Sequence, residues 1–138
     1  MVVRNALTRV CAVAALAIMA LLGSGEAAFA ASSNAVTYTD KTRAGEAWFN
    51  RSAASHGGHA WFDLYDAKCD NHEVYIEYIT IQDGTVADQK TFYNDGGCTT
   101  TWGKNLDSGH FAIQYRVCVD DKWWPVVDTC SGWKYDTN

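Results

Sequence analysis

The chain has 138 residues and a net charge of −5 at pH 7, from 16 acidic residues against 11 Lys and Arg. This length predicts one domain with a single core of modest size. The basic residues are scattered along the sequence, whereas nucleic acids and anionic membranes are bound by clustered Lys and Arg, so the composition argues against both as partners.

Residues 1–30 have the three parts of a secretory signal peptide. Arg4 and Arg9 supply a positive start, an apolar run extends from Val10 to Leu22, and Ala28-Phe29-Ala30 has the small-x-small pattern of a cleavage site. No second apolar run has the length of a membrane span. We therefore expect a secreted, extracellular protein whose charge is about −6 once this segment and its two Arg and one Glu are removed.

The cysteines predict two disulfides. Cys11 is lost with the signal segment, and the four that remain form an even set in a short exported chain, which is typical of a disulfide framework. Four cysteines allow three pairings. We expect Cys118–Cys130 to join the last two strands, and Cys69–Cys98 to join the start of the third strand to the turn after the fourth. Each bond is worth roughly 3 kcal/mol in the chain-entropy account.

Residues 31–43 are polar and weakly patterned, so we expect a flexible N-terminal arm before the folded domain. The short run of Val36, Thr37, Tyr38 and Thr39 has the residue types of a strand. Such a segment can pair with the edge of another protein's sheet. These four residues are therefore candidates for partner binding.

From residue 44 to 138 the sequence predicts one all-β domain. The expected strands are Ala47–Phe49, Ala60–Tyr65, Glu73–Ile81, Lys90–Tyr93, Phe111–Val119 and Val126–Trp133. Turn residues separate them, and no segment of this region has a sustained helical period. Six or seven short strands predict an antiparallel sandwich or small barrel, and we adopt a β-sandwich of immunoglobulin-like size.

No pattern in the sequence indicates catalysis, a cofactor or a metal. The histidines lack the spacing of zinc motifs, and there is no G-x-S-x-G nucleophile motif. Glu77 and Asp63 can be paired on paper as catalytic carboxylates, but a chain with this many acidic residues offers such pairs by chance. We therefore expect a protein that is not an enzyme.

The aromatic residues favour recognition. All six Trp and all seven Tyr follow the signal segment, which is more than a small core requires. Trp123 and Trp124 lie between the last two strands, and neighbours on a strand point to opposite faces, so we expect one of them to be exposed as a partner-binding anchor. Trp102 and Trp133 are expected to be packing residues.

Several short motifs resemble those of a group of secreted proteins. They are Trp48-Phe49, Tyr65 to His72, Val74-Tyr75 with Tyr78, Gly96 to Thr99, Tyr115 to Val119 and Asp128 to Trp133. Together they resemble small secreted two-disulfide β-sandwich proteins of actinobacteria, particularly Streptomyces. The resemblance covers Trp48 to Trp133 and leaves residues 31–43 outside.

Some proteins of that kind serve as the B, or adaptor, subunit of umbrella toxin particles. The resemblance implies a non-catalytic adaptor that joins a lectin-like subunit to a large repeat-bearing toxin. It also implies that the polar arm enters a cleft of the partner. These are expectations about function that rest on the resemblance.

Two other kinds of function fit the same residues. A secreted carbohydrate-binding module would stack Trp123 or Trp124 on sugar rings. A protease inhibitor would use the loop Arg51 to Gly58 as bait, but this loop lacks a disulfide of its own to fix its shape, so we rank it last.

Overall fold

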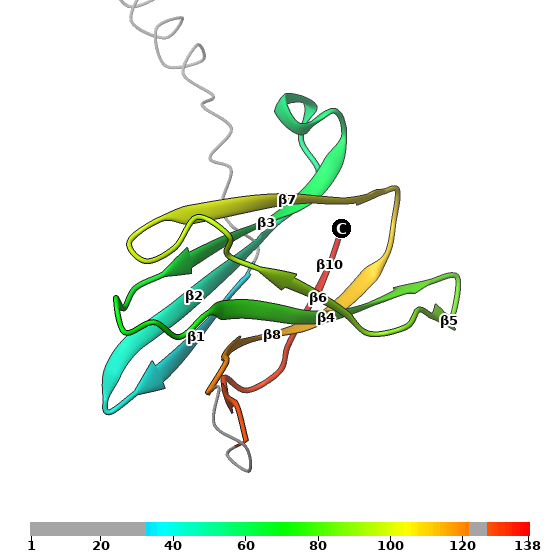
Figure 1. Ribbon diagram of the computed structural model, residues 1–138. Helices are drawn as coiled ribbons and strands as arrows, with labels where there is room; N and C mark the ends of the chain where they lie inside the picture. The colour runs from blue at the N-terminus through cyan, green and yellow to red at the C-terminus, as the bar shows by residue number, and fades with distance from the viewer. Residues whose placement is uncertain (1–32, 122–126) are drawn as a thin grey trace, which may run out of the picture.

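The computed structural model describes residues 33–121 and 127–138. Within them the chain forms short strands and a single turn of 3₁₀ helix, η1 (Figure 1). In chain order the elements are β1 (Ser33–Thr39), β2 (Thr42–Asn50), η1 (Ala54–His56), β3 (His59–Asp66), β4 (Val74–Gln82), β5 (Thr85–Val86), β6 (Lys90–Tyr93), β7 (Thr101–Ser108), β8 (Ala112–Val119), β9 (Thr129–Cys130) and β10 (Lys134–Thr137).

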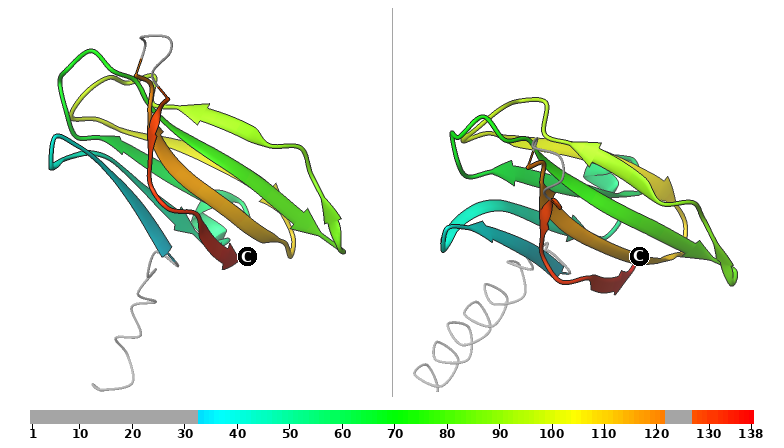
Figure 2. Two further views of the ribbon diagram at one scale, coloured as in Figure 1. Left: turned by 90° about the horizontal axis from the view of Figure 1, so that it is seen from below. Right: turned by 60° about the horizontal axis from the view of Figure 1, so that its bottom comes forward.

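The strands form two antiparallel sheets that pack face to face (Figure 2). The first sheet has the order β1-β2-β3-β7, and the second has the order β10-β8-β4-β5. In the second sheet β6 also pairs with β4, and β9 also pairs with β8. The prediction of an all-β sandwich is confirmed.

The core lies between the sheets because alternate residues of the central strands point inward. Three aromatic rings meet at its centre, with ring centroids 5.8 Å apart for Phe49 and Phe62 and 5.2 Å apart for Phe62 and Tyr115. Burial raises the pKa of Tyr115 to about 12, and its hydroxyl lies 2.8 Å from that of Ser33. This contact joins β1 to the second sheet.

Strand β1 overturns the prediction of a flexible arm for residues 33–43. β1 pairs with β2 from Ser33 opposite Phe49 to Thr39 opposite Thr42. Ala35 is fully buried and Thr37 is only 2% exposed, so alternate residues of β1 enter the core. The folded domain therefore begins with β1, and the boundary expected at residues 43 and 44 falls inside β2.

Four of the expected strands agree with the structure to within one residue at each end, and they correspond to β3, β4, β6 and β8. The first expected strand is longer than predicted, since β2 extends over residues 42–50. The last is wrong: of residues 127–133 only Thr129–Cys130 forms a strand, β9, and residue 126 lies outside the described part. β5, β7 and β10 were not predicted.

Both expected disulfides are confirmed. Cys118 and Cys130 are direct partners in the register of β8 and β9, with Cα atoms 4.0 Å apart. Cys69 and Cys98 join the β3–β4 loop to the β6–β7 loop, with Cα atoms 5.0 Å apart. Two disulfides in a small β domain are compatible with an extracellular location. Within residues 33–121 and 127–138, no helix has the length and apolarity that a membrane span requires.

Candidate interaction surfaces

The four partner-binding candidates on β1 do not form one surface. Thr37 points inward, and its hydroxyl donates to the Thr129 carbonyl at 3.2 Å. The Thr39 hydroxyl accepts a hydrogen bond from Lys68 Nζ at 2.8 Å. Val36, which is partly exposed, and Tyr38, which is 57% exposed, point away from the core along this edge strand.

The other two candidates, Trp123 and Trp124, lie outside the described residues. Asp121 and Asp128, which lie on either side of residues 122–126, are held together. The Asp121 backbone N–H donates to Asp128 Oδ1 at 3.2 Å, and the Tyr75 hydroxyl donates to Asp128 Oδ2 at 2.5 Å. Burial, with this carboxylate beside it, raises the pKa of Tyr75 well above its usual range.

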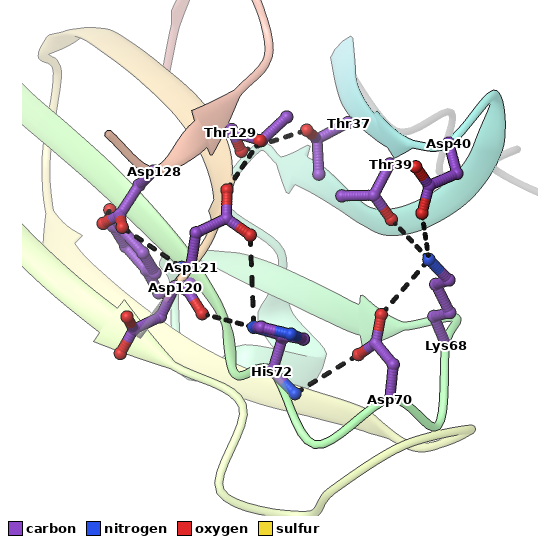
Figure 3. A network of polar contacts seen from close by, with 11 residues as sticks. Thr37, Thr39, Asp40, Lys68, Asp70, His72, Asp120, Asp121, Asp128 and Thr129 are labelled. Carbon is purple, nitrogen blue, oxygen red and sulfur yellow. Dashed lines mark hydrogen bonds and ion pairs between the residues drawn. The ribbon is translucent and has the colours of Figure 1, made fainter. Parts of the chain in front are cut away.

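Both disulfides lie at one end of the sandwich, which we call the disulfide end. It comprises the β3–β4 loop, the β6–β7 loop and the residues that flank Trp123 and Trp124 (Figure 1). A polar network runs across it (Figure 3). On one side of this network, Lys68 Nζ lies 2.8 Å from Thr39 Oγ1, 3.3 Å from Asp70 Oδ2 and 3.5 Å from Asp40 Oδ2.

The other side of the network is centred on His72. Its backbone N–H donates to Asp70 Oδ1 at 3.2 Å, and its Nδ1 lies 2.9 Å from the Asp120 carbonyl oxygen. Asp121 accepts from the Thr129 hydroxyl at 2.7 Å, and the chain of contacts ends where Thr37 donates to the Thr129 carbonyl (Figure 3). The network therefore fixes the positions of three chain segments that are far apart in sequence.

A pocket of about 470 Å³ lies beside this network, and we call it the acidic pocket. The β3–β4 and β6–β7 loops form its walls, and the Cys69–Cys98 disulfide is part of its lining. Three carboxyl groups line it, from Asp66, Glu73 and Asp95. Lys68 also lines it, but its ammonium group already has the three oxygen partners described above.

Asp66 is the buried charge of the acidic pocket. The residue is 4% exposed, and its Oδ1 accepts a hydrogen bond from the Lys68 backbone N–H at 3.1 Å. Among the described residues, its Oδ2 has no hydrogen-bond partner. Burial raises the pKa of this carboxyl, the Lys68 N–H opposes the rise, and the nearby charge of Asp70 adds to it.

The outer surface of the second sheet carries an apolar face formed by Ile79, Ile81, Val86, Ala112 and Tyr135, with Gln114 lying between Ile79 and Tyr135. The register places these side chains on one side, because direct partners in a sheet point the same way: Ile81 lies opposite both Val86 and Ala112. Val86 is 63% exposed and Tyr135 is 71% exposed. Exposed apolar side chains that gather on one face are typical of a protein interaction site.

A polar border lies next to the apolar face. Arg116 Nε donates to Glu77 Oε2 at 2.7 Å, and its guanidinium lies 4.6 Å from the centre of the Trp133 ring. Interfaces between proteins commonly have an apolar centre, a polar rim and an enrichment of Tyr, Trp and Arg. Trp133 is partly exposed and packs against Arg116 on this outer surface, and Trp102 is 44% exposed, contrary to the prediction that it is a packing residue.

The outer surface of the first sheet is aromatic and polar. Trp48, Trp61 and Tyr65 are partly exposed and share this surface with Asp63, whose Oδ2 accepts from Trp61 Nε1 at 3.1 Å and from Asn50 Nδ2 at 3.0 Å. Two of the rings are already covered. The His56 ring is stacked on Trp61 at 3.7 Å between centroids, and the Arg43 guanidinium lies 5.3 Å from the centre of the Tyr65 ring.

The pairs of groups considered for chemistry do not converge. Glu77 and Asp63 lie on the outer surfaces of different sheets, so the sandwich separates them. The His56 and His59 rings contact different oxygens, those of Asn105 at 3.1 Å and of the Leu106 carbonyl at 2.7 Å. Across residues 33–121 and 127–138, no three His, Cys, Asp or Glu side chains are grouped to hold a metal ion.

Two features of this surface were missed in the sequence. Ile79 and Ile81 occupy the positions of Glu73–Ile81 that alternate with the buried residues, so their apolar character was a readable signal of an exposed apolar face. The acidic pocket gave no such signal, because its walls are separated by more than twenty residues and meet through the Cys69–Cys98 bond.

Comparison of the chain with protein families, with curated proteins and with solved structures finds no match.

Proposed function

We propose that this chain is a secreted, non-catalytic adaptor that binds other extracellular proteins. The observation that carries the proposal is the apolar face, on which Val86 and Tyr135 expose most of their surface, with the Arg116–Trp133 pair beside Tyr135. Such surface is costly to leave in water and becomes favourable when a partner covers it. The signal-like residues 1–30 and the two disulfides support an extracellular place of action.

The finer form of the proposal comes from the sequence resemblance. In it, the partners are a lectin-like subunit and a large repeat-bearing toxin of an umbrella particle. Because residues 33–39 are a strand of the domain itself, a free arm is not the means of contact in this version. Asn34, Val36 and Tyr38 are the outward-facing side chains at that edge.

The experiment is capture of secreted proteins from culture medium by the tagged chain, followed by mass spectrometry. We expect Val86→Lys to reduce the captured partner by about tenfold, because a charge placed in an apolar contact loses its hydration. Gln89→Lys is the matched control, since it adds the same charge at an exposed position outside the apolar face. Equal capture by both variants would contradict a role for the apolar face.

The identity of the captured proteins tests the finer form separately. Recovery of a repeat-bearing protein together with a lectin-like protein supports the umbrella assignment. Recovery of two different extracellular proteins of other kinds leaves an adaptor of another system, and recovery of one protein or of the chain alone removes the proposal.

Carbohydrate binding is a second candidate, favoured by the aromatic and polar surface of the first sheet. There a Cβ added to Gly103 would lie 3.7 Å from Asp63 Oδ1, so the glycine keeps the surroundings of that carboxylate open. Trp48 and Asp63 are direct register partners, which places an indole next to an acceptor, as sugar sites require. Retention on insoluble glycans that disappears in Trp48→Ala distinguishes this candidate from the adaptor.

Protease inhibition has less support. The Arg51 side chain donates to the Thr137 carbonyl at 3.0 Å and to Asp136 Oδ1 at 2.9 Å, so it is bound to the C-terminal strand. A bait residue has to project into the protease instead.

A further inference from the structure

We propose that the acidic pocket receives the ammonium group of a lysine side chain from the protein partner. The inference rests on the proposed adaptor function, because it assigns a second contact to the same partner-binding chain. It concerns a different part of the molecule from the apolar face.

The first argument is charge. Asp66, Glu73 and Asp95 line the pocket, while the ammonium of Lys68 is turned to Thr39, Asp40 and Asp70. The His72 ring is held by the Asp120 carbonyl. The pocket therefore has an excess of negative charge that its own cation leaves uncompensated, and a positive group from outside would be attracted to it.

The second argument is the free oxygen of Asp66. Asp66 is 4% exposed as a residue, it lines the pocket, and among the described residues only its Oδ1 accepts a hydrogen bond. Leaving a buried polar atom without a partner is unfavourable. A donor that enters the pocket and reaches Oδ2 would give this oxygen a hydrogen bond, and that hydrogen bond would favour binding.

The third argument selects the kind of cation. Oδ1 is already used by the Lys68 N–H, so Asp66 presents a single oxygen rather than the two that a guanidinium binds side by side. An ammonium is a point charge that suits single contacts. The carboxyl groups are spread around a volume of about 470 Å³ rather than converging as metal ligands do, which disfavours a bound metal ion.

The walls of the pocket are fixed before any partner arrives. The Cys69–Cys98 bond joins its two loops, and Asn94 Nδ2 donates to the Leu64 carbonyl at 3.0 Å and to the Thr100 carbonyl at 2.9 Å. The Gly96 N–H donates back to Asn94 Oδ1 at 2.9 Å. A rigid pocket loses little freedom on binding, which favours recognition of one side chain.

The test uses nuclear magnetic resonance on the ¹⁵N-labelled protein with both disulfides formed. The probes are three capped tripeptides, Gly-Lys-Gly, Gly-Arg-Gly and Gly-Gln-Gly. We expect the Lys peptide to shift the amide signals of residues 66–73 and 94–98, with a dissociation constant on the order of 1 mM. The Arg peptide should bind more weakly, and the Gln peptide should leave these signals unchanged.

Asp66→Asn should weaken binding of the Lys peptide by about tenfold or more, because it removes the buried charge and keeps the shape. Glu73→Gln, at an exposed position, is a second variant that does not threaten folding. Asp88→Asn is the matched control: it removes an exposed acid in the β5–β6 connection, outside the pocket, and should bind as the wild type does.

Two results would overturn the proposal. One is a Lys peptide that shifts no signal of the pocket, or shifts it equally in wild type and Asp66→Asn. The other is saturation of the same signals by micromolar calcium chloride, which would make the pocket a metal site. If the Lys peptide fails while capture through the apolar face succeeds, the pocket is excluded and the adaptor remains. If it binds while capture fails, the adaptor is excluded and a cation site remains.

Discussion

At the scale of single residues, Asp66 couples stability to pH. Burial raises the pKa of its carboxyl in the folded chain, so the folded state holds a proton at pH values where the unfolded chain, with a pKa of about 3.9, has released it. Stability from this group is therefore greatest at low pH and falls as pH rises through the folded-state pKa. Asp136 acts in the opposite sense: hydrogen bonds from Ser33 and Thr137, with Arg51 nearby, lower its pKa against the effect of burial.

Asp66→Asn isolates the contribution of Asp66. We expect the variant to gain stability relative to wild type as pH rises above about 4, because the amide does not ionise and the buried carboxyl does. Urea unfolding of both chains between about pH 3 and pH 8 measures the difference, and the effect of Asp136 cancels because both chains contain it. A difference that stays constant across this range would contradict an ionising, desolvated Asp66.

Residues of binding sites often lower the stability of the folded chain. Asp66 is expected to do so at neutral pH, because binding uses its charged carboxylate. The Asp66→Asn variant is predicted to be more stable than the wild type and also to bind the Lys peptide more weakly. Opposite changes in stability and binding would be difficult to explain by a purely structural role for this carboxyl.

At the scale of elements, β1 is a strand of the sandwich, and substitutions on it can test how much it contributes to stability. We expect Ala35→Asp to lower the free energy of unfolding by about 3 kcal/mol, because it buries an unpaired charge between the sheets. Tyr38→Asp is the control on the same strand and should change it by less than about 1 kcal/mol, since Tyr38 is mostly exposed. Thermal or urea unfolding gives both values, and equal small effects would restore the flexible arm.

The elements that the sequence predicted well are those with strict alternation or a long run of strand-forming residues. β8 alternates large inward residues with small or polar ones over eight positions, and β4 is a nine-residue run rich in β-branched and aromatic residues, so their ends are readable to within one residue. β1 escapes detection because its inward residues are the small or polar Ala35 and Thr37. It also turns into β2 through Asp40-Lys41, both with positive φ, in place of the usual Asn-Gly or Asp-Gly pair.

β7 escapes for a different reason. Its sequence contains Gly103, Lys104, Asn105 and Asp107, which are typical of loops, and as an edge strand it needs few buried residues. Only Leu106 of β7 is buried. Its pairing with β3 is a tertiary effect that local preference does not predict.

At the scale of the whole molecule, two different surfaces are placed at opposite ends of β4. The acidic pocket includes Glu73 just before the strand, and the apolar face includes Ile79 and Ile81 near its other end. At about 3.3 Å per residue, their separation along β4 is roughly 20 Å. Chemically distinct surfaces at this distance have room for two contacts at once, which an adaptor requires.

The disulfide framework was predictable because Cys118 and Cys130 lie on the last two expected strands, and Cys69 and Cys98 lie at the start of the third and after the fourth. The pocket was not predictable, because its shape depends on how two loops meet in space. The apolar face was partly predictable. Ile79 and Ile81 of β4 indicated it, but the positions of Val86 and Tyr135 depend on β5 and β10, neither of which was predicted as a strand.

The central claim is that this chain holds two different proteins together. The most direct measurement is native mass spectrometry of the assembly captured from culture medium by the tagged chain. We predict one complex whose mass accounts for the chain plus two distinct partners, and loss of one of them in Val86→Lys. A complex with a single partner, or the chain alone, would contradict the claim.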